Sequence, residues 1–168
     1  MTHTKRFTIL RATAMLAMTG AVLVGANVAE AQKGRSWREQ LTWSDAAGKP
    51  SLRDDGGAIY IWHDGNTVKI ATTSGRDRSA TIRATVEKGS ITDVHRVHDE
   101  RGDTIRWPSS NTVEFSSRTK GGLDEMNFQI RKGRTLIINV DQGRGHRPIY
   151  VGKHEIKADS GRIAIEIR

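Results

Sequence analysis

The stretch GAIYIWHDGNTVKIATT, residues 57–73, has the pattern of a β-hairpin. An Asp-Gly pair accepts the positive φ angles of a two-residue turn, so we expect Asp64-Gly65 to form the loop. A loop at Gly65-Asn66 would shift the pairing by two residues and leave the two faces of the hairpin unchanged. Because side chains alternate along a strand, one face is aliphatic and the other mixes aromatic and polar residues. The aliphatic face carries Ile59, Ile61, Val68 and Ile70, and the mixed face carries Tyr60, Trp62, Thr67 and Lys69.

Short segments in which apolar and polar residues alternate follow this hairpin to the end of the chain, with turn-forming residues between them. This pattern is typical of antiparallel sheets that are wet on one face. It predicts an all-β domain of about nine or ten strands, arranged as an antiparallel sandwich or a partly closed barrel. One segment departs from strict alternation, because Val94 and Val97 are three residues apart. This spacing indicates either a β-bulge or a short helical turn, and the β-branched residues of the segment favour the bulge.

The apolar positions of the later segments also predict how these segments pair. Residues 105–107 match residues 113–115 as the two arms of a hairpin. Residues 126–130 match residues 136–140 if the loop between them holds an odd number of residues. Residues 149–151 are then expected to return beside the last of these segments.

The first residues have the composition of a signal peptide. Three basic residues precede an apolar stretch over residues 12–29, and Ala29-Glu30-Ala31 fits the small-residue pattern of a cleavage site. We therefore expect residues 1–31 to be removed on export to the periplasm or to the extracellular space. No second apolar stretch of that length follows, so no transmembrane segment is expected in the mature chain.

Between the signal peptide and the hairpin, residues 32–56 are predicted to form a short N-terminal helix and a linker. Trp37, Leu41 and Trp43 lie near one face at helical spacing, and Gly48 and the proline that follows end the pattern. A helix of about ten to twelve residues is marginal by itself, so it must dock on the β-domain. That domain is expected to comprise residues 57–168.

The chain is basic and has no cysteine. Its 27 Lys and Arg residues exceed its 19 Asp and Glu residues, which gives a net charge of +8, and loss of three cations and one anion with the signal peptide changes this charge to +6. The excess favours an anionic partner, whereas the even mixing of the two signs favours a role in solubility and argues against specific nucleic-acid binding. Without cysteine the domain has neither disulfides nor thiolate metal sites, so it relies on its sheets for stability.

Several short motifs occur in an order found in a group of small secreted bacterial β-domains. They are W-x-D-G at 62–65, T-T at 72–73, V-x-x-V at 94–97 with Glu100 and Asp103 after it, G-G-L-D before N-F at 121–128, and I-Y-V-G at 149–152. The chain resembles this uncharacterised group over residues 57–152, although Glu125 stands where such sequences often have glycine. The resemblance implies an exported β-domain and implies no activity.

No metal site, cofactor or catalytic residue is expected. The histidines of His95-x-x-His98 would point to opposite faces of a regular strand, and the acidic residues after them lack the alternation of a calcium loop. The sequence has no motif of a serine or cysteine nucleophile, of a zinc protease or of a P-loop. Adjacent acids such as Asp54-Asp55 and Asp124-Glu125 do not face each other across a cleft as glycoside hydrolysis requires.

Two surfaces are candidates for binding. The mixed face of the hairpin offers aromatic rings to a sugar or an apolar partner, unless the 37–43 segment packs over it. The glycine-rich loop of residues 141–147 can present backbone N–H groups and arginines to a phosphate or a carboxylate, and the alternative is a solvated hairpin loop. The predicted ligand-binding residues are Tyr60, Trp62, Lys69, Arg144 and Arg147.

These observations favour a non-enzymatic, exported β-sandwich module that binds an envelope component. The expected partner is a polysaccharide, an anionic polymer or a protein of the envelope. One alternative is a hydrolase acting on envelope polymers, with carboxylates assembled from separate strands. Another is a structural or assembly subunit that associates with itself.

Overall fold

The computed structural model describes residues 38–52, 57–74, 78–98, 102–119, 122–143, 147–156 and 161–167. These residues form twelve β-strands and no helix, which confirms the predicted all-β class. The strands are β1 (Arg38–Thr42), β2 (Ala58–Asp64), β3 (Thr67–Ser74), β4 (Arg78–Glu87), β5 (Ser90–His98), β6 (Thr104–Ser109), β7 (Thr112–Thr119), β8 (Gly122–Arg131), β9 (Thr135–Asp141), β10 (Ile149–Val151), β11 (His154–Ile156) and β12 (Gly161–Glu166).

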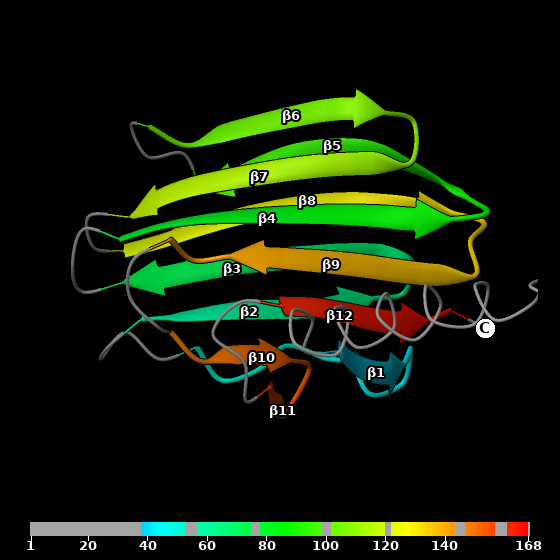
Figure 1. Ribbon diagram of the computed structural model, residues 1–168, viewed down its shortest axis with the longest axis horizontal. Coiled ribbons are helices and arrows are strands. Elements are labelled where there is room, and N and C mark those ends of the chain that lie inside the picture. The colour runs from blue at the N-terminus through cyan, green and yellow to red at the C-terminus, as the bar shows by residue number, and fades with distance from the viewer. Residues whose placement is uncertain are drawn as a thin grey trace, which may run out of the picture. The chain divides into compact units, whose positions relative to one another are not determined.

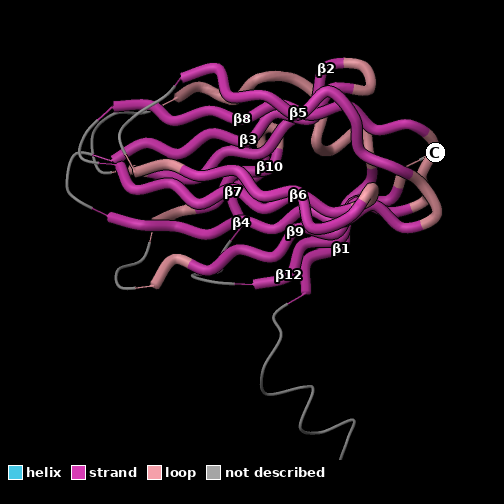
Figure 2. The backbone as a smooth tube through the Cα atoms, turned by 90° about the horizontal axis from the view of Figure 1, so that it is seen from above, coloured by secondary structure: helices cyan, strands magenta, loops and turns pink. Residues whose placement is uncertain are grey.

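The strands form two six-stranded sheets that pack face to face (Figure 1), and the two layers are seen from above in Figure 2. Sheet A has the order β1-β12-β9-β4-β7-β6, and sheet B has the order β11-β10-β2-β3-β8-β5. Both sheets are mixed, because β1 lies parallel to β12 and β10 lies parallel to β2. Over the described residues each sheet is open, with an edge strand at either end of its strand order, so the architecture is a sandwich and not a barrel.

The main hydrophobic core lies between the two sheets. Alternate residues of each strand point inward, as expected for a sandwich whose outer faces are wet. Ile59 and Phe128 of sheet B and Ile82 and Phe115 of sheet A are all 0% exposed. The aliphatic face of the hairpin lies in this core, which confirms the predicted division of the hairpin into two faces.

The central hairpin turns one residue later than the Asp-Gly pair predicts. Asp64 pairs with Thr67 and Ile61 pairs with Ile70, so the loop is Gly65-Asn66. The φ angle is positive at Gly65 (58°) and not at Asn66, which is the φ pattern of a type II′ turn with glycine in first place. The pairing is therefore shifted by two residues from the expected one, and the side chains keep their faces.

Two predicted pairings are wrong because the chain changes sheets. β8 belongs to sheet B and β9 to sheet A, so residues 126–130 and 136–140 pack in the same core without sharing a ladder. Gly133 lies at this crossing, where a Cβ would come within 2.7 Å of the side chain of Val86. β10 pairs in parallel with β2, Ile149 beside Ile59, and not with β9. The pairing of Ile105 with Phe115 is confirmed.

The predicted N-terminal helix is wrong over the described residues. Arg38–Thr42 form β1, and residues 43–46 turn toward sheet B. Leu41 pairs with Ile165 on β12 and packs against the core. Apolar residues at positions 41 and 43 fit a strand as well as a helix, and the edge of β12 supplies partners for the backbone groups of β1 that a short isolated helix would lack.

The edge strands β5 and β6 lie along the same side of the sandwich (Figure 1). β5 has two register shifts around Val94 and Val97, which confirms the predicted bulge. β6 is irregular between Arg106 and Ser109, where Pro108 has no N–H for a ladder. Such irregularities protect an edge from pairing with another sheet.

Candidate functional site

The two aromatic residues predicted as ligand contacts are buried on the outer face of sheet B. Tyr60 is 1% exposed and Trp62 is 3% exposed. They form a second apolar cluster with Ala58 and Ala71, bordered by Leu52, Leu123 and Tyr150. At this level of burial, neither ring face can touch a ligand unless the residues that cover it move.

The cover over these rings comes from the segment after β1 and from β10. Lys49 Nζ lies 6.0 Å from the ring centroid of Trp62, within cation-π range. Tyr150 stacks on Tyr60 with ring centroids 5.4 Å apart and an interplanar angle of 15°. The described part of the expected cover, residues 41–43, packs against the main core instead.

Two hollows open where this cluster meets the surface. The larger, of about 480 Å³, contains Lys69, which is half-buried. It is lined by Ala47, Gly48, Lys49, Trp62, His63, Asp64, Gly65 and Lys69. The other, of about 240 Å³, is lined by Lys49, Pro50, Ser51, Tyr150, Gly152 and Lys153. Lysines line both hollows, so the aromatic cluster meets solvent beside positive charge.

Arg147 is buried and holds the described ends of the predicted anion loop. It is 2% exposed, and its Nη2 donates to the carbonyl oxygen of Ser79 at 3.3 Å. Its backbone N–H and carbonyl both bond to the side chain of Gln142, each at 2.9 Å. Arg144 lies outside the described residues. The structure thus gives Arg147 a clear structural role, and its predicted part in ligand binding stays a prediction.

A small polar cluster occupies one end of the core. Thr72 and Asp124 come from sheet B and Ser117 from sheet A, and none is more than 2% exposed. Ser117 Oγ donates to Asp124 Oδ2 at 2.6 Å, and the hydroxyls of Thr72 and Ser117 are 2.7 Å apart. Hydrogen bonds to a buried carboxylate are stronger than neutral ones. This cluster therefore pins the two sheets together and is closed to a substrate.

The turn after β1 is attached to the central hairpin through His63. The His63 ring stacks on Trp43 with centroids 3.9 Å apart and an interplanar angle of 15°. Its Nε2 lies 2.6 Å from the carbonyl oxygen of Trp43, and its Nδ1 lies 3.1 Å from that of Gly65. With 8% exposure and two backbone partners, His63 is a structural residue.

Asp45 closes the same turn. The backbone N–H of Thr42 donates to Asp45 Oδ2 at 2.8 Å, and the Thr42 hydroxyl donates to the same atom at 2.7 Å. These two bonds, the backbone one first, hold the pKa of Asp45 below its ordinary value of 3.8. His154 Nε2 lies 3.9 Å from Asp45 Oδ1 and acts in the same direction.

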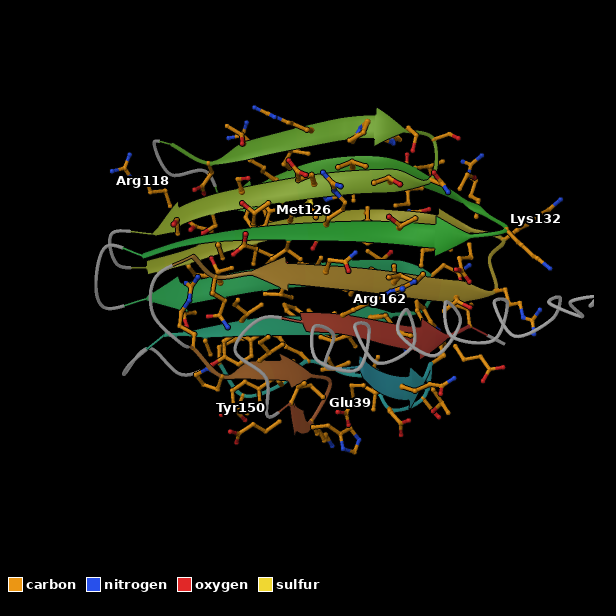
Figure 3. The ribbon with its side chains drawn as sticks, viewed as in Figure 1. Glu39, Arg118, Met126, Lys132, Tyr150 and Arg162 are labelled. Carbon is orange, nitrogen blue, oxygen red and sulfur yellow. The ribbon has the colours of Figure 1, made fainter. Side chains whose placement is uncertain are left out.

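The outer face of sheet A carries a row of charged and polar residues across five adjacent strands. The register of the sheet aligns one outward residue of each strand. This arginine row consists of Arg162 on β12, Asn139 on β9, Arg83 on β4, Glu114 on β7 and Arg106 on β6. Sheet A is the nearer layer in Figure 3, where Arg162 is labelled. The three cations and one anion of the arginine row give it a net charge of +2.

One ion pair lies within the arginine row. Arg83 donates to Glu114 Oε2 from Nη2 at 2.6 Å and from Nε at 3.0 Å, and the Arg83 side chain remains 55% exposed. Within the described residues, neither Arg106 nor Arg162 has a carboxylate within 4.0 Å. Two guanidinium groups of the row are therefore available to an external anion.

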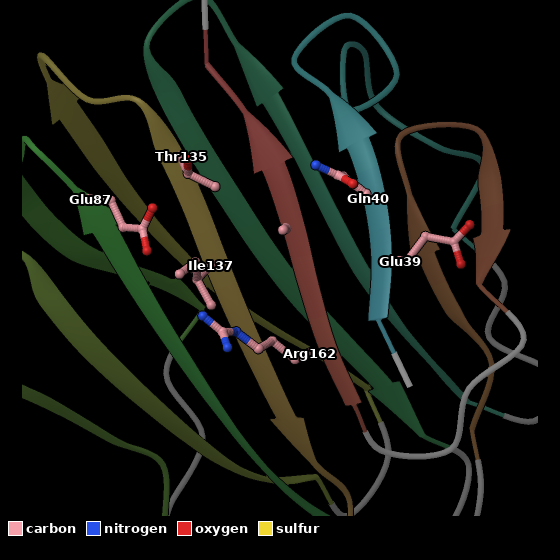
Figure 4. Close-up of a pocket in the computed structure, with 7 residues that line it drawn as sticks. Glu39, Gln40, Glu87, Thr135, Ile137 and Arg162 are labelled. Carbon is pink, nitrogen blue, oxygen red and sulfur yellow. The ribbon is translucent and has the colours of Figure 1, made fainter. Parts of the chain in front are cut away.

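A shallow pocket of about 230 Å³ borders the arginine row at β12 (Figure 4). Ala164 and Ile137 contribute apolar surface, and Figure 4 shows Arg162 extending from β12 toward Ile137. Its lining residues are Glu39, Gln40, Glu87, Thr135, Ile137, Arg162 and Ala164. The pocket is smaller than those that enclose drug-sized ligands, which begin at about 300 Å³. It can hold only part of a larger ligand.

The row ends at an edge strand that also exposes an aromatic side chain. Among the described residues, the exposed large apolar side chains are Trp107 on β6, at 51%, and Val97 on β5, at 45%. Isolated exposed apolar residues are common on protein surfaces and carry no function by themselves. Trp107 follows Arg106 directly, so its fluorescence is a natural reporter of events at this end of the row.

Neither a metal centre nor a membrane-spanning helix is found in the described part of the chain. No group of three or more histidine, aspartate or glutamate residues is placed to hold a metal ion there. No helix there has the length and apolar character needed to cross a membrane. His95 and His98, the closest pair of histidines in the sequence, lie on the irregular strand β5, and only the backbone of His98 is described.

Comparison with known proteins gives no family. No protein-family model matches the sequence, and no curated protein matches it. Among solved structures, the human F-spondin reeler domain matches with 12% identity and a TM-score of 0.39, over 70% of this chain and 94% of that chain. A non-cellulosomal cohesin from Archaeoglobus fulgidus matches with 10% identity and a TM-score of 0.37, over 67% and 91%. Function therefore has to be argued from the surfaces of this chain.

The residues of the arginine row were not predicted as a site. Each occupies an outward position of an alternating strand, and this signal is visible in the sequence for Arg83 and Arg162. The row itself joins residues as distant as 83 and 162, and only the strand order and register bring them together.

Proposed function

We propose that this chain is a non-enzymatic β-sandwich module that binds an anionic polysaccharide of the envelope on the outer face of sheet A. The arginine row is the observation that carries the proposal. Guanidinium groups bind carboxylates and sulfates through two parallel hydrogen bonds, and a line of like charges raises the local concentration of a polyanion. The net charge of +6 that the chain would carry without residues 1–31 has the same sign as the row.

Binding is favoured over hydrolysis by the state of the carboxylates near the row. Glu114 is engaged by Arg83, so it is not placed to exchange protons with a ligand. Asp124, away from the row on sheet B, is 0% exposed and accepts a hydrogen bond from Ser117 Oγ at 2.6 Å. Glu39 on β1 and Glu87 on β4 line the pocket beside Arg162, and their backbones lie three strand steps, about 14 Å, apart. Glycoside hydrolysis needs an acid and a base about 5–9.5 Å apart across a cleft.

We also propose that the chain acts outside the cytoplasm, in the periplasm or beyond. The basic start, the apolar stretch over residues 12–29 and the Ala29-Glu30-Ala31 sequence support export and cleavage. The N-terminal sequence of the protein recovered from cells tests this point. A chain that begins at Gln32 supports it, and a chain that retains the apolar stretch contradicts it.

Binding of soluble polyanions measured by calorimetry tests the proposed function. The probes are hyaluronate and polygalacturonate, with neutral dextran as the control polymer. We expect both polyanions to bind at about 0.01 M salt and to bind much more weakly at about 1 M, where the screening length falls from about 30 Å to about 3 Å. Dextran should not bind. Equal binding of dextran, or no binding of either polyanion, contradicts the proposal.

A pair of charge-matched variants separates the arginine row from general basic charge. The double variant Arg106→Gln/Arg162→Gln removes two row cations, and Arg131→Gln/Lys132→Gln removes two exposed cations that lie outside the row. At about 1 kcal/mol per cation near an anionic surface, the row variant should weaken binding about 25-fold. The control variant should change affinity much less. Equal losses would mean that net charge, and not this face, drives binding.

A further inference from the structure

From β12 to β6, the arginines of the row occupy every second strand. On the remaining strand of sheet A, Arg38 of β1 is aligned with Arg162 of its neighbour β12. Neighbouring strands lie about 4.8 Å apart, so the positions of Arg162, Arg83 and Arg106 follow one another at steps of about 10 Å. Asn139 and Glu114 occupy the two strands between them. Over these five strands the row therefore presents a repeating distance and not a continuous band of charge.

Glu114 makes this repeat selective. A ligand with an anionic group every 5 Å or so would place one group at the position of Glu114, where like charges repel. A ligand with one anionic group every 10 Å or so places its charges at the arginines and passes over Glu114. Arg83 is paired with Glu114 but keeps three of its five N–H groups for a ligand, so Arg106 and Arg162 are the two unpaired cations of the row.

A second row, of hydroxyl side chains, runs beside the arginine row. It consists of Thr81 on β4, Ser116 on β7 and Thr104 on β6, which the register also aligns. The hydroxyls of Thr81 and Ser116 lie 3.2 Å apart. Hydroxyl groups both donate and accept hydrogen bonds, which suits the hydroxyls of a sugar.

The same face is a poor platform for nucleic acid. Trp107 at the β6 edge is the one large aromatic side chain that is exposed among the described residues, and a single ring does not form the series of stacking platforms on which single-stranded nucleic acid binds. Adjacent strands of a sheet are rotated by about 20–25° relative to each other, so the direction in which the row's side chains point rotates by roughly 80–100° between β12 and β6. A flexible chain can follow this turn, and a flat crystalline surface cannot.

We infer that the ligand is a flexible, linear polysaccharide with one carboxylate per disaccharide, and that it crosses the strands of sheet A along the arginine row. One disaccharide of an extended chain has about the length of the two-strand step. This inference rests on the proposed function, because it specifies which polyanion the arginine row prefers.

Competition between two polymers of different charge spacing tests the inference. Hyaluronate carries one carboxylate per disaccharide and polygalacturonate carries one on every sugar. At equal carboxylate concentration, the full protein should bind hyaluronate at least about five-fold more tightly. Equal binding of both polymers overturns the spacing inference and leaves the proposed function standing. Failure of both to bind overturns both.

Two variants locate the origin of the preference. Glu114→Gln removes the repelling charge, so it should raise the affinity for polygalacturonate and narrow the difference between the polymers. The double variant Thr104→Arg/Arg106→Thr keeps composition and net charge but moves one guanidinium two residues along the exposed strand β6, which lengthens its distance from Arg83 to about 12 Å. It should lower the affinity for hyaluronate about five-fold. An unchanged preference in both variants contradicts the inference.

Discussion

Replacing Gly152 with alanine tests whether the turn after β1 is held on sheet B by close backbone packing. Gly152 has a φ angle of 55°, and a Cβ there would overlap the carbonyl oxygen of Asp45 and lie 3.2 Å from backbone atoms of Ala46. The left-handed conformation costs an alanine about 1–2 kcal/mol. Displacing well-packed backbone adds about 1–3 kcal/mol. We therefore expect Gly152→Ala to lower the free energy of unfolding by about 2–5 kcal/mol.

Gly65→Ala is the matched control for this change. Gly65 has nearly the same φ angle, 58°, and a Cβ there would have no heavy atom within 4 Å. Its substitution should cost only the conformational part, about 1–2 kcal/mol. Urea unfolding followed by far-ultraviolet circular dichroism measures both variants, and their difference isolates the steric cost. Equal losses of stability would refute the close packing of Gly152 against the turn.

Three further predictions concern the polar contacts that hold the sandwich together. Hydrogen bonds keep the pKa of Asp45 below 3.8, so the stabilising effect of the ionised carboxylate is present above pH 3.8 and is lost as the pH falls through the lower pKa of the folded state. The difference in stability between the natural protein and Asp45→Asn should therefore shrink on acidification. A difference that stays constant down to about pH 2 would contradict this. His63→Ala removes the stack on Trp43 and should lower the free energy of unfolding in urea by about 1–3 kcal/mol. Unchanged stability would show that the contact of His63 with the turn after β1 is not needed. Ser117→Ala removes a donor to the buried Asp124 carboxylate and should cost about 1.5–3 kcal/mol, and a loss below about 0.5 kcal/mol would count against an inter-sheet lock.

Local alternation was enough to predict the all-β class and the faces of the central hairpin. Side-chain period depends only on the strand itself, so Ile59 and Ile61 had to face one way and Tyr60 and Trp62 the other. The turn was misplaced because both Asp64-Gly65 and Gly65-Asn66 suit a two-residue loop. The face assignment survived this error because the shift is an even number of residues.

Features that depend on distant partners were not predictable in the same way. Residues 38–42 became a strand because β12, at the other end of the chain, offers an edge. The turn between β8 and β9 resembles a hairpin in sequence, yet it carries the chain from one sheet to the other. The apolar positions of β8 and β9 would be the same in a hairpin and in a crossing between sheets, because in either arrangement each strand buries one face in the same core.

The candidate site shows the same limit. The burial of Tyr60 and Trp62 depends on Lys49 and Tyr150, which no local rule places over them. The arginine row exists only through the register of five strands, so no single segment contains it. Alternation places Arg83 and Arg162 at outward positions of their own strands, and only the strand order of sheet A aligns them with each other.

Arginine footprinting in the presence of ligand tests the central claim most directly. The full protein is treated with phenylglyoxal with and without hyaluronate, and modified arginines are identified by mass spectrometry. We predict that hyaluronate protects Arg83, Arg106 and Arg162 and leaves the exposed Arg131 of sheet B as reactive as in the free protein. Protection of Arg131 with the row left reactive, or uniform protection of all four, would contradict a binding surface on the outer face of sheet A.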